Sequence, residues 1–318
     1  MVACKDERNG GILKENYKMK NGNFIKTSWK KFAKFSLGAK IVLTFYFVLF
    51  VFEAIIHLFP IFFVLNNSFK NTYDPLNAMA VEFDLFTTKN FVNVFTKFKW
   101  GGLNFFGMFI NSLWSTCLYI FVNVASSTML AYALARFRFP GRNFLYGIVI
   151  FIQTVPIMGG GAADFKLRSS LGMVNNPGLL WISWAMGFDY TCFILYGIFQ
   201  GISRSYSESA KLDGASSLQV LLKIMLPQAL PAILAMCVTN FTTRWNDYAT
   251  FQLYLSKYPN LAFGLYQFAN SGSNTSAYAG GKLTYYAALL CASVPVIVIY
   301  ASSQSLILKN IAVGGLKG

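Results

Sequence analysis

The residues of this chain that could carry chemistry are a few ionisable side chains inside long apolar segments. Arg244 and Asp247 stand three positions apart, and Asp189 precedes Tyr190 in another apolar segment. A charged side chain near the centre of a membrane helix costs about 2.5–3.5 kcal/mol on insertion scales, so each is a candidate for function. An ion pair between Arg244 and Asp247 along one helix face would reduce both costs. A polar path and an internal ion pair therefore both stay open for this pair.

The sequence contains few residues that would support other kinds of chemistry. Glu53 and His57 lie four positions apart in the first apolar segment, where we expect them to pair with each other. The stretch GGKLT at 280–284 lacks the spacing of a phosphate-binding loop. The five cysteines are scattered, four of them within apolar segments, where small buried side chains are expected. We therefore expect no metal, no bound cofactor and no catalytic residue in this chain.

The elements that position these residues are long apolar helices. Of the 318 residues 55% are hydrophobic and only 12% are charged, about half of the roughly 25% found in soluble domains. A bilayer core of about 30 Å needs about 20 helical residues. We therefore predict an all-α integral membrane protein with six transmembrane helices, the third being the weakest. The predicted spans are Ile41–Leu65, Phe105–Ala135, Phe144–Met158, Gly178–Phe199, Ala229–Leu253 and Leu283–Leu308.

The basic residues predict how these helices are oriented. Ten of the 27 Lys and Arg residues lie in the first forty positions, and the short loops after spans two and four carry more. Because Lys and Arg are enriched on the cytoplasmic side, both termini are predicted to be cytoplasmic. With ten basic and three acidic residues, this leader carries +7 of the net charge of +15; the basic residues form no folded patch, so no nucleic-acid partner is expected.

A polar stretch, SESAKLDGASSLQVLLKIMLP, separates the fourth and fifth predicted spans. Ser207 before Glu208 is typical of a helix start, with an acid where the helix dipole favours it. Gly214 then interrupts the helical pattern. We predict two short helices joined at Gly214 along the inner membrane surface, with Pro227 opening the next span. The apolar face of the second helix is predicted to be Leu218, Leu221, Leu222 and Met225.

Such a stretch could simply lie on lipid headgroups, but its spacing resembles the EAA loop of ABC-importer permeases. Glu208-Ser209-Ala210 is followed after three residues by Gly214, after nine more by Ile224, and then by Leu226-Pro227. Ser209 stands where the family has its middle alanine. In that family the loop docks into the ATP-binding subunit and transmits its motion. The resemblance implies ATPase coupling by Glu208, Ser209, Ala210, Asp213, Gly214, Ile224, Leu226 and Pro227.

Further stretches resemble carbohydrate permeases similar to the G-type subunit of the maltose importer. They are FPIFFVLNNSFK, the run from Asn111 to Arg142, RWNDY and the closing SQSLILKNIAVGGLKG. The chain departs from the family at Gly159-Gly160-Gly161, where relatives usually carry a second proline. Because the family's tail reaches toward the ATPase dimer, the resemblance implies additional coupling candidates at Gly314, Gly315, Lys317 and Gly318.

The resemblance implies a permease of the type I importer fold in a bacterial cytoplasmic membrane. Its partners would be a second, F-type permease, two subunits that bind ATP and Mg, and an external sugar-binding protein. We expect a cytoplasmic tail at 1–40, the first helix and an outer segment at 41–103, a permease core at 104–308 with the EAA loop at 204–227, and a cytoplasmic tail at 309–318. The Gly/Ser/Asn-rich segment at 254–282 is either a flexible loop or, as in the family, a contact with the sugar-binding protein.

The transported molecule is expected to be a sugar or oligosaccharide, while glycerol phosphate and uronate-containing glycans remain open. Sugars are bound by hydrogen bonds and aromatic contacts. An ion-coupled carrier using Glu53 and His57, or Arg244 and Asp247, is the alternative function. An interhelical hydrogen bond is the alternative role for Asp189 and Tyr190. The candidate translocation path comprises Asp189, Tyr190, Asn240, Arg244, Trp245, Asn246 and Asp247.

Overall fold

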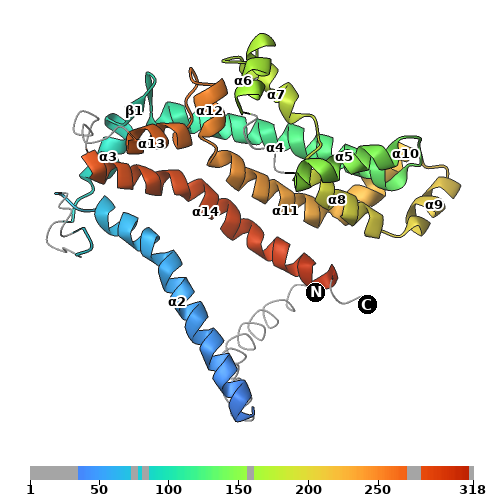
Figure 1. The fold of residues 1–318 in the computed structure, drawn as a ribbon, viewed down its shortest axis with the longest axis horizontal. Helices are drawn as coiled ribbons and strands as arrows, with labels where there is room; N and C mark the ends of the chain where they lie inside the picture. The colour runs from blue at the N-terminus through green and yellow to red at the C-terminus, as the bar shows by residue number, and fades with distance from the viewer. Residues whose placement is uncertain (1–34, 73–77, 81–85, 156–160, 271–280, 315–318) are drawn as a thin grey trace, which may run out of the picture. The chain divides into compact units, whose positions relative to one another are not determined.

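The computed structural model describes residues 35–72, 78–80, 86–155, 161–270 and 281–314 (Figure 1). These residues are almost entirely helical, as expected where apolar segments must satisfy their backbone hydrogen bonds internally. By their contacts they fall into two compact units, Met1–Phe63 and Val64–Gly318. Most of the basic leader, the stretch 271–280 and the last four residues lie outside the described residues.

Helix α2 (Leu37–Ser68) supplies the described part of the first unit. It is apolar all round its circumference, which is typical of a helix surrounded by lipid or protein. Pro60 lies inside the helix without ending it, as predicted. His57 contacts Glu53 through Nδ1 and the main-chain carbonyl oxygen, 2.8 Å apart, and not through the carboxylate. The predicted pairing of these two side chains is therefore wrong.

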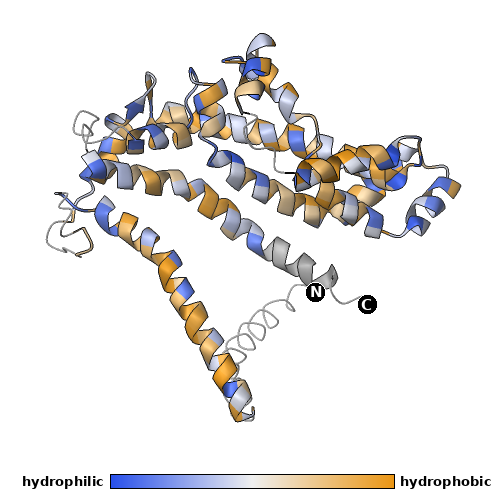
Figure 2. Ribbon diagram, viewed as in Figure 1, coloured by the Kyte–Doolittle hydropathy of each residue, from blue (hydrophilic) through white to orange (hydrophobic). Residues whose placement is uncertain are grey.

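The second unit is built on four helices: α4 (Phe105–Arg136), α8 (Tyr190–Gly201), α11 (Leu226–Trp245) and α14 (Gly281–Gly314). Helix α4 packs against α8 and α11, and α11 packs in turn against α14 (Figure 1). Apolar residues predominate along these helices, whereas polar residues gather in α9 and in the connections (Figure 2).

Shorter elements connect these helices. A two-residue hairpin, β1 (Lys99–Trp100) paired with β2 (Leu103–Asn104), is the one departure from an all-α chain among the described residues. The other elements are α3 (Lys89–Thr96), α5 (Arg142–Thr154), α6 (Gly161–Ser170), α7 (Pro177–Trp184), α9 (Arg204–Leu212), α10 (Ser217–Val220), the π-helical turn η2 (Leu221–Met225), α12 (Ala249–Tyr254) and α13 (Leu261–Asn270).

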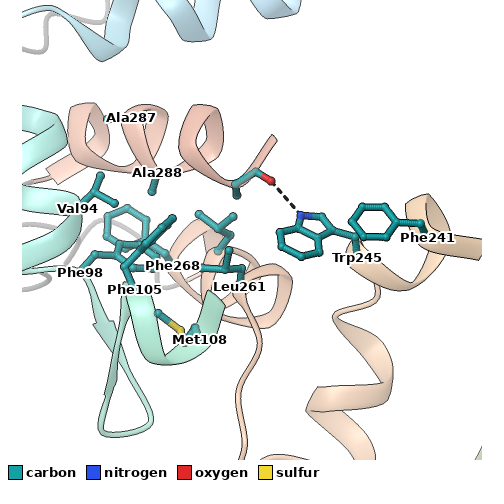
Figure 3. Packing of buried hydrophobic residues seen from close by; sticks show 12 residues of the cluster. Val94, Phe98, Phe105, Met108, Phe241, Trp245, Leu261, Phe268, Ala287 and Ala288 are labelled. Carbon is teal, nitrogen blue, oxygen red and sulfur yellow. Dashed lines mark hydrogen bonds between the residues drawn. The ribbon is translucent and has the colours of Figure 1, made fainter. Parts of the chain in front are cut away.

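An aromatic core joins α4, α11, α13 and α14 (Figure 3). The indole Nε1 of Trp245 donates to the carbonyl oxygen of Ala292 at 2.9 Å, which fixes the end of α11 to α14. Phe241 stacks on the same indole with ring centroids 5.4 Å apart. A second core of small, aliphatic and aromatic side chains lies between α4 and α8 and continues to Val220 and Met225.

Four described helices are long and apolar enough to cross a membrane: Leu37–Ser68, Phe105–Arg136, Ser217–Trp245 and Gly281–Gln304. These correspond to the predicted first, second, fifth and sixth spans. The third is represented by α5, with 13 residues. The fourth is not one helix, because the chain breaks between α7 and α8. The fifth begins earlier than predicted and ends at Trp245, and the sixth continues beyond Leu308.

Candidate functional site

The first candidate site is the segment 204–227, which lies at one end of the second unit (Figure 1). Two helices flank Gly214, as predicted. The first begins at Arg204 and not at Ser207, because Ser203 caps it by accepting a hydrogen bond from the main-chain N–H of Ser205 at 3.3 Å.

Gly214 closes helix α9 in a Schellman motif. Its φ of +84° is in the left-handed region that favours glycine. The N–H of Gly214 donates to the carbonyl of Lys211, and the N–H of Ala215 donates to the carbonyl of Ala210. Ala210 and Ala215 both pack partly against the second core. The two alanines thus tie the turn to the body of the protein.

The next helix starts with a capping box at Ser216. The Gln219 side chain accepts from the Ser216 N–H at 2.8 Å, and Ser216 Oγ accepts from the Gln219 N–H at 3.3 Å. From Ser217 the chain then runs through α10, η2 and α11 as one continuous helix to Trp245. The second helix of the segment is therefore the first part of a spanning helix, and Pro227 lies in it without opening a new one.

Only part of the predicted apolar face of this second helix packs against the rest of the chain. Met225 is fully buried, but Leu218 and Leu222 are 63% and 53% exposed, while Val220 is fully buried instead. The cause is the π-helical turn, in which the N–H of Leu226 bonds to the carbonyl of Leu221, five residues back. This wider turn shifts the buried positions away from the 3.6-residue period.

The solvent-facing side of the segment combines charge with apolar area. Glu208 and Ser209 are exposed, and Leu212 is 89% exposed at the tip beside Asp213. Among the other predicted coupling residues, Ile224 and Leu226 are half-buried and Pro227 is exposed. Gly314 ends α14, and the other three tail candidates lie outside the described residues.

The second candidate site is a cavity of about 240 Å³ in the second unit, hereafter the arginine cavity. It is lined by residues of α4, α6, α7, α11, α12 and the connection from α7 to α8. Three aromatic residues line it, namely Tyr119, Trp184 and Tyr254. Its other lining residues are Asn123, Arg168, Ser183, Met186, Gly187, Phe188, Asp189, Arg244 and Thr250.

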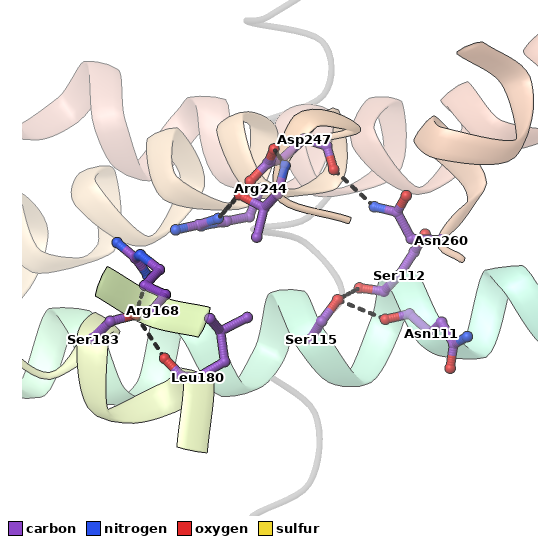
Figure 4. Close-up of polar contacts among 10 residues, drawn as sticks. Asn111, Ser112, Ser115, Arg168, Leu180, Ser183, Arg244, Asp247 and Asn260 are labelled. Carbon is purple, nitrogen blue, oxygen red and sulfur yellow. Dashed lines mark hydrogen bonds and ion pairs between the residues drawn. The ribbon is translucent and has the colours of Figure 1, made fainter. Parts of the chain in front are cut away.

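Arg244 is held in place on one side of this cavity. Its Nη1 pairs with Asp247 at 2.5 Å and contacts Thr250 Oγ1 at 3.3 Å. The guanidinium carbon lies 3.9 Å from the centre of the Tyr119 ring and 5.4 Å from that of Trp184. The ion pair predicted for Arg244 is therefore present (Figure 4), but Asp247 lies beyond the end of α11 and does not share its helix face.

Asp189 lines the cavity at the break between α7 and α8. Its Oδ1 accepts from the N–H of Cys192 at 3.0 Å, capping α8, and from Ser127 Oγ on α4 at 2.8 Å. The interhelical hydrogen bond that was the alternative for Asp189 is thus present. Gly187, with φ +67°, brings the connection close to α4: a Cβ there would lie 3.1 Å from the Ser126 carbonyl carbon.

Arg168 anchors α6 in the lining of the cavity. It donates to Ser183 Oγ at 2.9 Å (Figure 4). It also pairs with Asp164 at 2.9 Å and lies 4.9 Å from the centre of the Tyr254 ring. The Tyr254 hydroxyl also donates to Asp164. Burial raises the pKa of Asp164, but the hydrogen bonds from Tyr254 and Arg168 outweigh it and hold that pKa below its ordinary value. Burial and the bond to Asp164 raise the pKa of Tyr254.

The predicted path residues are not all brought together. Asp189 and Arg244 line the arginine cavity, and Asp247 holds Arg244. The others do not line it: Trp245 lies in the aromatic core, and Asn240 donates to Thr191 Oγ1 at 3.0 Å, joining α11 to α8. Tyr190 and Asn246 are exposed.

Sequence reasoning found only Asp189 and Arg244 among the twelve lining residues of this cavity and missed the other ten, which include Tyr119, Asn123, Arg168, Trp184 and Tyr254. The one signal available was Asn123, an amide in the middle of a predicted span. Among the described residues no group of three His, Cys, Asp or Glu side chains could hold a metal ion. Of the described cysteines only Cys192 is buried, and Cys117 is exposed, contrary to prediction.

Comparisons with known proteins bear on both sites. A family model described as the inner membrane component of binding-protein-dependent transport systems matches residues 127–313. The diacetylchitobiose uptake system permease protein of Streptomyces coelicolor is 28% identical, over 82% of this chain and 84% of that protein. The polygalacturonan/rhamnogalacturonan transport system permease protein of Bacillus subtilis is 31% identical, over 65% of this chain and 75% of that protein.

A solved structure has the same fold. It is that of a bacterial ABC transporter involved in the import of the acidic polysaccharide alginate. The match covers 85% of this chain and 98% of the matched chain, with 22% identity and a TM-score of 0.70.

Proposed function

The chain belongs to the inner membrane components of binding-protein-dependent transport systems, and from that premise we propose that it is the permease subunit of an ATP-driven oligosaccharide importer. In this family the chain is the membrane component, and the ATPase is a separate subunit. The sugar cargo is supported by relatives named for diacetylchitobiose and galactooligosaccharides. The role of the ATPase partner is supported by the geometry of the 204–227 segment.

That geometry is the observation on which the proposal rests. A rigid turn, closed by the Schellman motif at Gly214, presents Glu208 and the side chain of Leu212 to solvent. An exposed leucine beside an exposed carboxylate fits a protein cleft with an apolar floor and a basic rim. We assign this face to an ATP-binding subunit. Of the other coupling residues predicted from the sequence, Ser209, Ala210 and Asp213 lie beside this turn, and Ile224, Leu226 and Pro227 follow in the helix that continues into the span.

The segment is connected mechanically to the spanning helices. Because residues 217–245 form one continuous helix, a displacement of the turn at Gly214 is carried directly into α11. Helix α11 ends at Trp245, one residue beyond the arginine that lines the cavity. Closure of two ATPase subunits would thus move α11 and change access to the arginine cavity, which is the coupling that alternating access requires.

The wider assembly follows from the same proposal. A second permease would complete the pathway, two ATP-binding subunits would carry ATP and Mg, and an external binding protein would deliver the sugar. We propose six crossings of a bacterial cytoplasmic membrane, with α5 and the broken pair α7 and α8 completing the count and both termini in the cytoplasm. The C-terminal residues from Gly314 onward would then reach the ATPase side.

The test is purification of the tagged chain from its native membrane in mild detergent, with mass spectrometry of the proteins that accompany it. Wild type is compared with Glu208→Lys, which reverses the exposed charge beside the turn. Lys257→Glu, a reversal of another exposed charge beyond α12, is the matched control. We expect an ATP-binding protein and a second permease with wild type and control, and loss of the ATP-binding protein from Glu208→Lys. Purification of the chain alone, or unchanged partners with Glu208→Lys, would overturn the assignment.

A further inference from the structure

The arginine cavity contains a buried hydrogen-bond acceptor without a donor. Asn123 is 4% exposed, and its Nδ2 reaches only the Trp184 carbonyl oxygen, at 3.5 Å. Its Oδ1 accepts no hydrogen bond from any described residue. A buried polar atom left unpaired destabilises the fold, so its persistence calls for an explanation. Because Asn123 lines the cavity, a small shift of its side chain would present this buried oxygen to a hydroxyl group inside the cavity.

Other hydrogen-bonding groups face the same space. Asp189 accepts both of its hydrogen bonds from described residues through Oδ1, which leaves Oδ2 as a second acceptor for a ligand. Arg244 pairs with Asp247 and Thr250 through Nη1, and a guanidinium has five N–H donors in all. Tyr119 and Trp184, edge to face with ring centroids 5.6 Å apart, form the apolar wall of the cavity, with Arg244 over one face of the Tyr119 ring. A ring with polar edges and apolar C–H faces matches this pattern.

We infer that the arginine cavity is a subsite of this chain for one neutral sugar ring of the transported oligosaccharide. The inference deepens the proposed function and rests on it. It assigns hydroxyl recognition to Asn123 and Asp189, and the apolar wall to Tyr119 and Trp184. Tyr119 and Asn123 belong to α4, Trp184 ends α7, and Asp189 caps α8. The break between α7 and α8 in the fourth span therefore forms the subsite.

The charges select a neutral ring over a uronate. Arg168 and Arg244 are each already paired with an aspartate, Asp164 and Asp247. Asp189 adds a third carboxylate that directly lines the cavity. With two arginines against three aspartates, the cavity offers no net positive charge to a carboxylate ligand, and a like charge near Asp189 is unfavourable. A sugar hydroxyl, which donates to Asn123 and Asp189 without bringing charge, meets no such penalty.

The experiment uses the assembled transporter in proteoliposomes, with ATP inside and the binding protein outside. The probes are neutral maltotetraose, cellotetraose and galactotetraose, and acidic tetragalacturonate. Sugar uptake and ATP hydrolysis are measured together for wild type, Asn123→Leu and Thr128→Val. Thr128 on the same helix is similarly buried and its Oγ1 is likewise unpaired among the described residues, but it lies outside the cavity, so Thr128→Val is the matched control.

We expect a neutral tetrasaccharide to be imported. Asn123→Leu should then lower the sugar imported per ATP hydrolysed about three- to tenfold, the equivalent of one buried hydrogen bond. ATP hydrolysis should continue, and Thr128→Val should leave the ratio unchanged. A misfolded variant would lose ATP hydrolysis as well, which distinguishes misfolding from loss of the subsite. The comparison of neutral and acidic sugars uses only the wild-type transporter, so it does not depend on how any variant folds.

The contrary results are distinct. An unchanged ratio in Asn123→Leu would overturn the subsite. Import of tetragalacturonate alone would overturn its neutral character. Import of none of the four sugars would overturn the carbohydrate cargo and the subsite with it, whereas a failed capture of the ATP-binding subunit by the tagged chain would refute the coupling proposal separately.

Discussion

Gly187 lies where the connection from α7 to α8 approaches the main chain of α4, and we expect Gly187→Ala to be more harmful than its size suggests. The φ of +67° is strained for alanine by about 1–2 kcal/mol, partly offset by about 0.4–1 kcal/mol from the less flexible unfolded chain. The new Cβ would lie 3.1–3.2 Å from main-chain atoms of Ser126 and Ser127. Because those atoms belong to helix α4 and cannot rotate away, we expect a further loss of about 1–3 kcal/mol, as in an overpacked core.

A matched control separates the two contributions. Gly172 has the same φ of +67°, but a Cβ at that position would have no other side chain or neighbouring backbone within 4 Å, so Gly172→Ala carries the backbone strain alone. The midpoint of heat inactivation of the detergent-solubilised transporter is measured for both variants. We expect the Gly187→Ala midpoint to lie lower by roughly 2–4 °C for each kcal/mol of difference, scaling from chains of about 150–250 residues. Equal midpoints would refute the close-contact argument, whatever their absolute values.

Two further predictions concern polar contacts between elements. Since the pKa of Asp164 is held below its ordinary value, the stability it provides is complete above an unfolded pKa of about 3.9 and is lost only as the pH falls through the lower folded value. Asp164→Asn should therefore lower the inactivation midpoint equally at pH 5 and pH 8, and a difference between the two would contradict this. Trp245→Phe removes the donor to the Ala292 carbonyl, a loss of about 0.6 and at most about 1.7 kcal/mol, and the smaller phenyl ring adds the cost of a cavity in the aromatic core. In Trp114→Phe, which loses a bond within one helix, the midpoint should fall less.

Much of the architecture was predictable because long apolar runs leave the backbone no alternative to helix. Four predicted spans are single helices, and the two helices around Gly214 follow from the glycine and the residues that cap them. The break in the fourth span was not predictable from hydropathy, because 178–199 is apolar almost throughout. The break depends on the close approach of Gly187 to α4 and on the cap that Asp189 provides for α8. The hydrophobic periodicity of the segment reveals neither contact.

The cavity was predictable only in part, for a related reason. Arg244 and Asp189 stood out because charge is rare within apolar segments. Tyr119, Trp184 and Tyr254 resemble the many other aromatic residues of the chain, and only the packing of α4, α7 and α12 brings them together. The sequence places Arg168 among the outer-loop charges, since nothing in it links this residue to Ser183 or Tyr254.

The π-helical turn carries a prediction of its own, because it explains how Val220 and Met225, five residues apart, are both fully buried. In a regular α-helix five residues advance about 500°, which would place the two on different sides, whereas four advance about 400° and keep one face. The turn therefore contains one residue more than a regular helix would.

Deleting the exposed Leu222 should restore an α-helix with both buried residues still facing the core, so the turn at Gly214 keeps its orientation and ATPase capture survives. Deleting the exposed Leu234 from the regular part of α11 should instead rotate the chain before it by about 100° and abolish capture. Loss of capture in both deletions alike would mean that the extra residue is needed for coupling itself, and that the turn is more than an accommodated insertion.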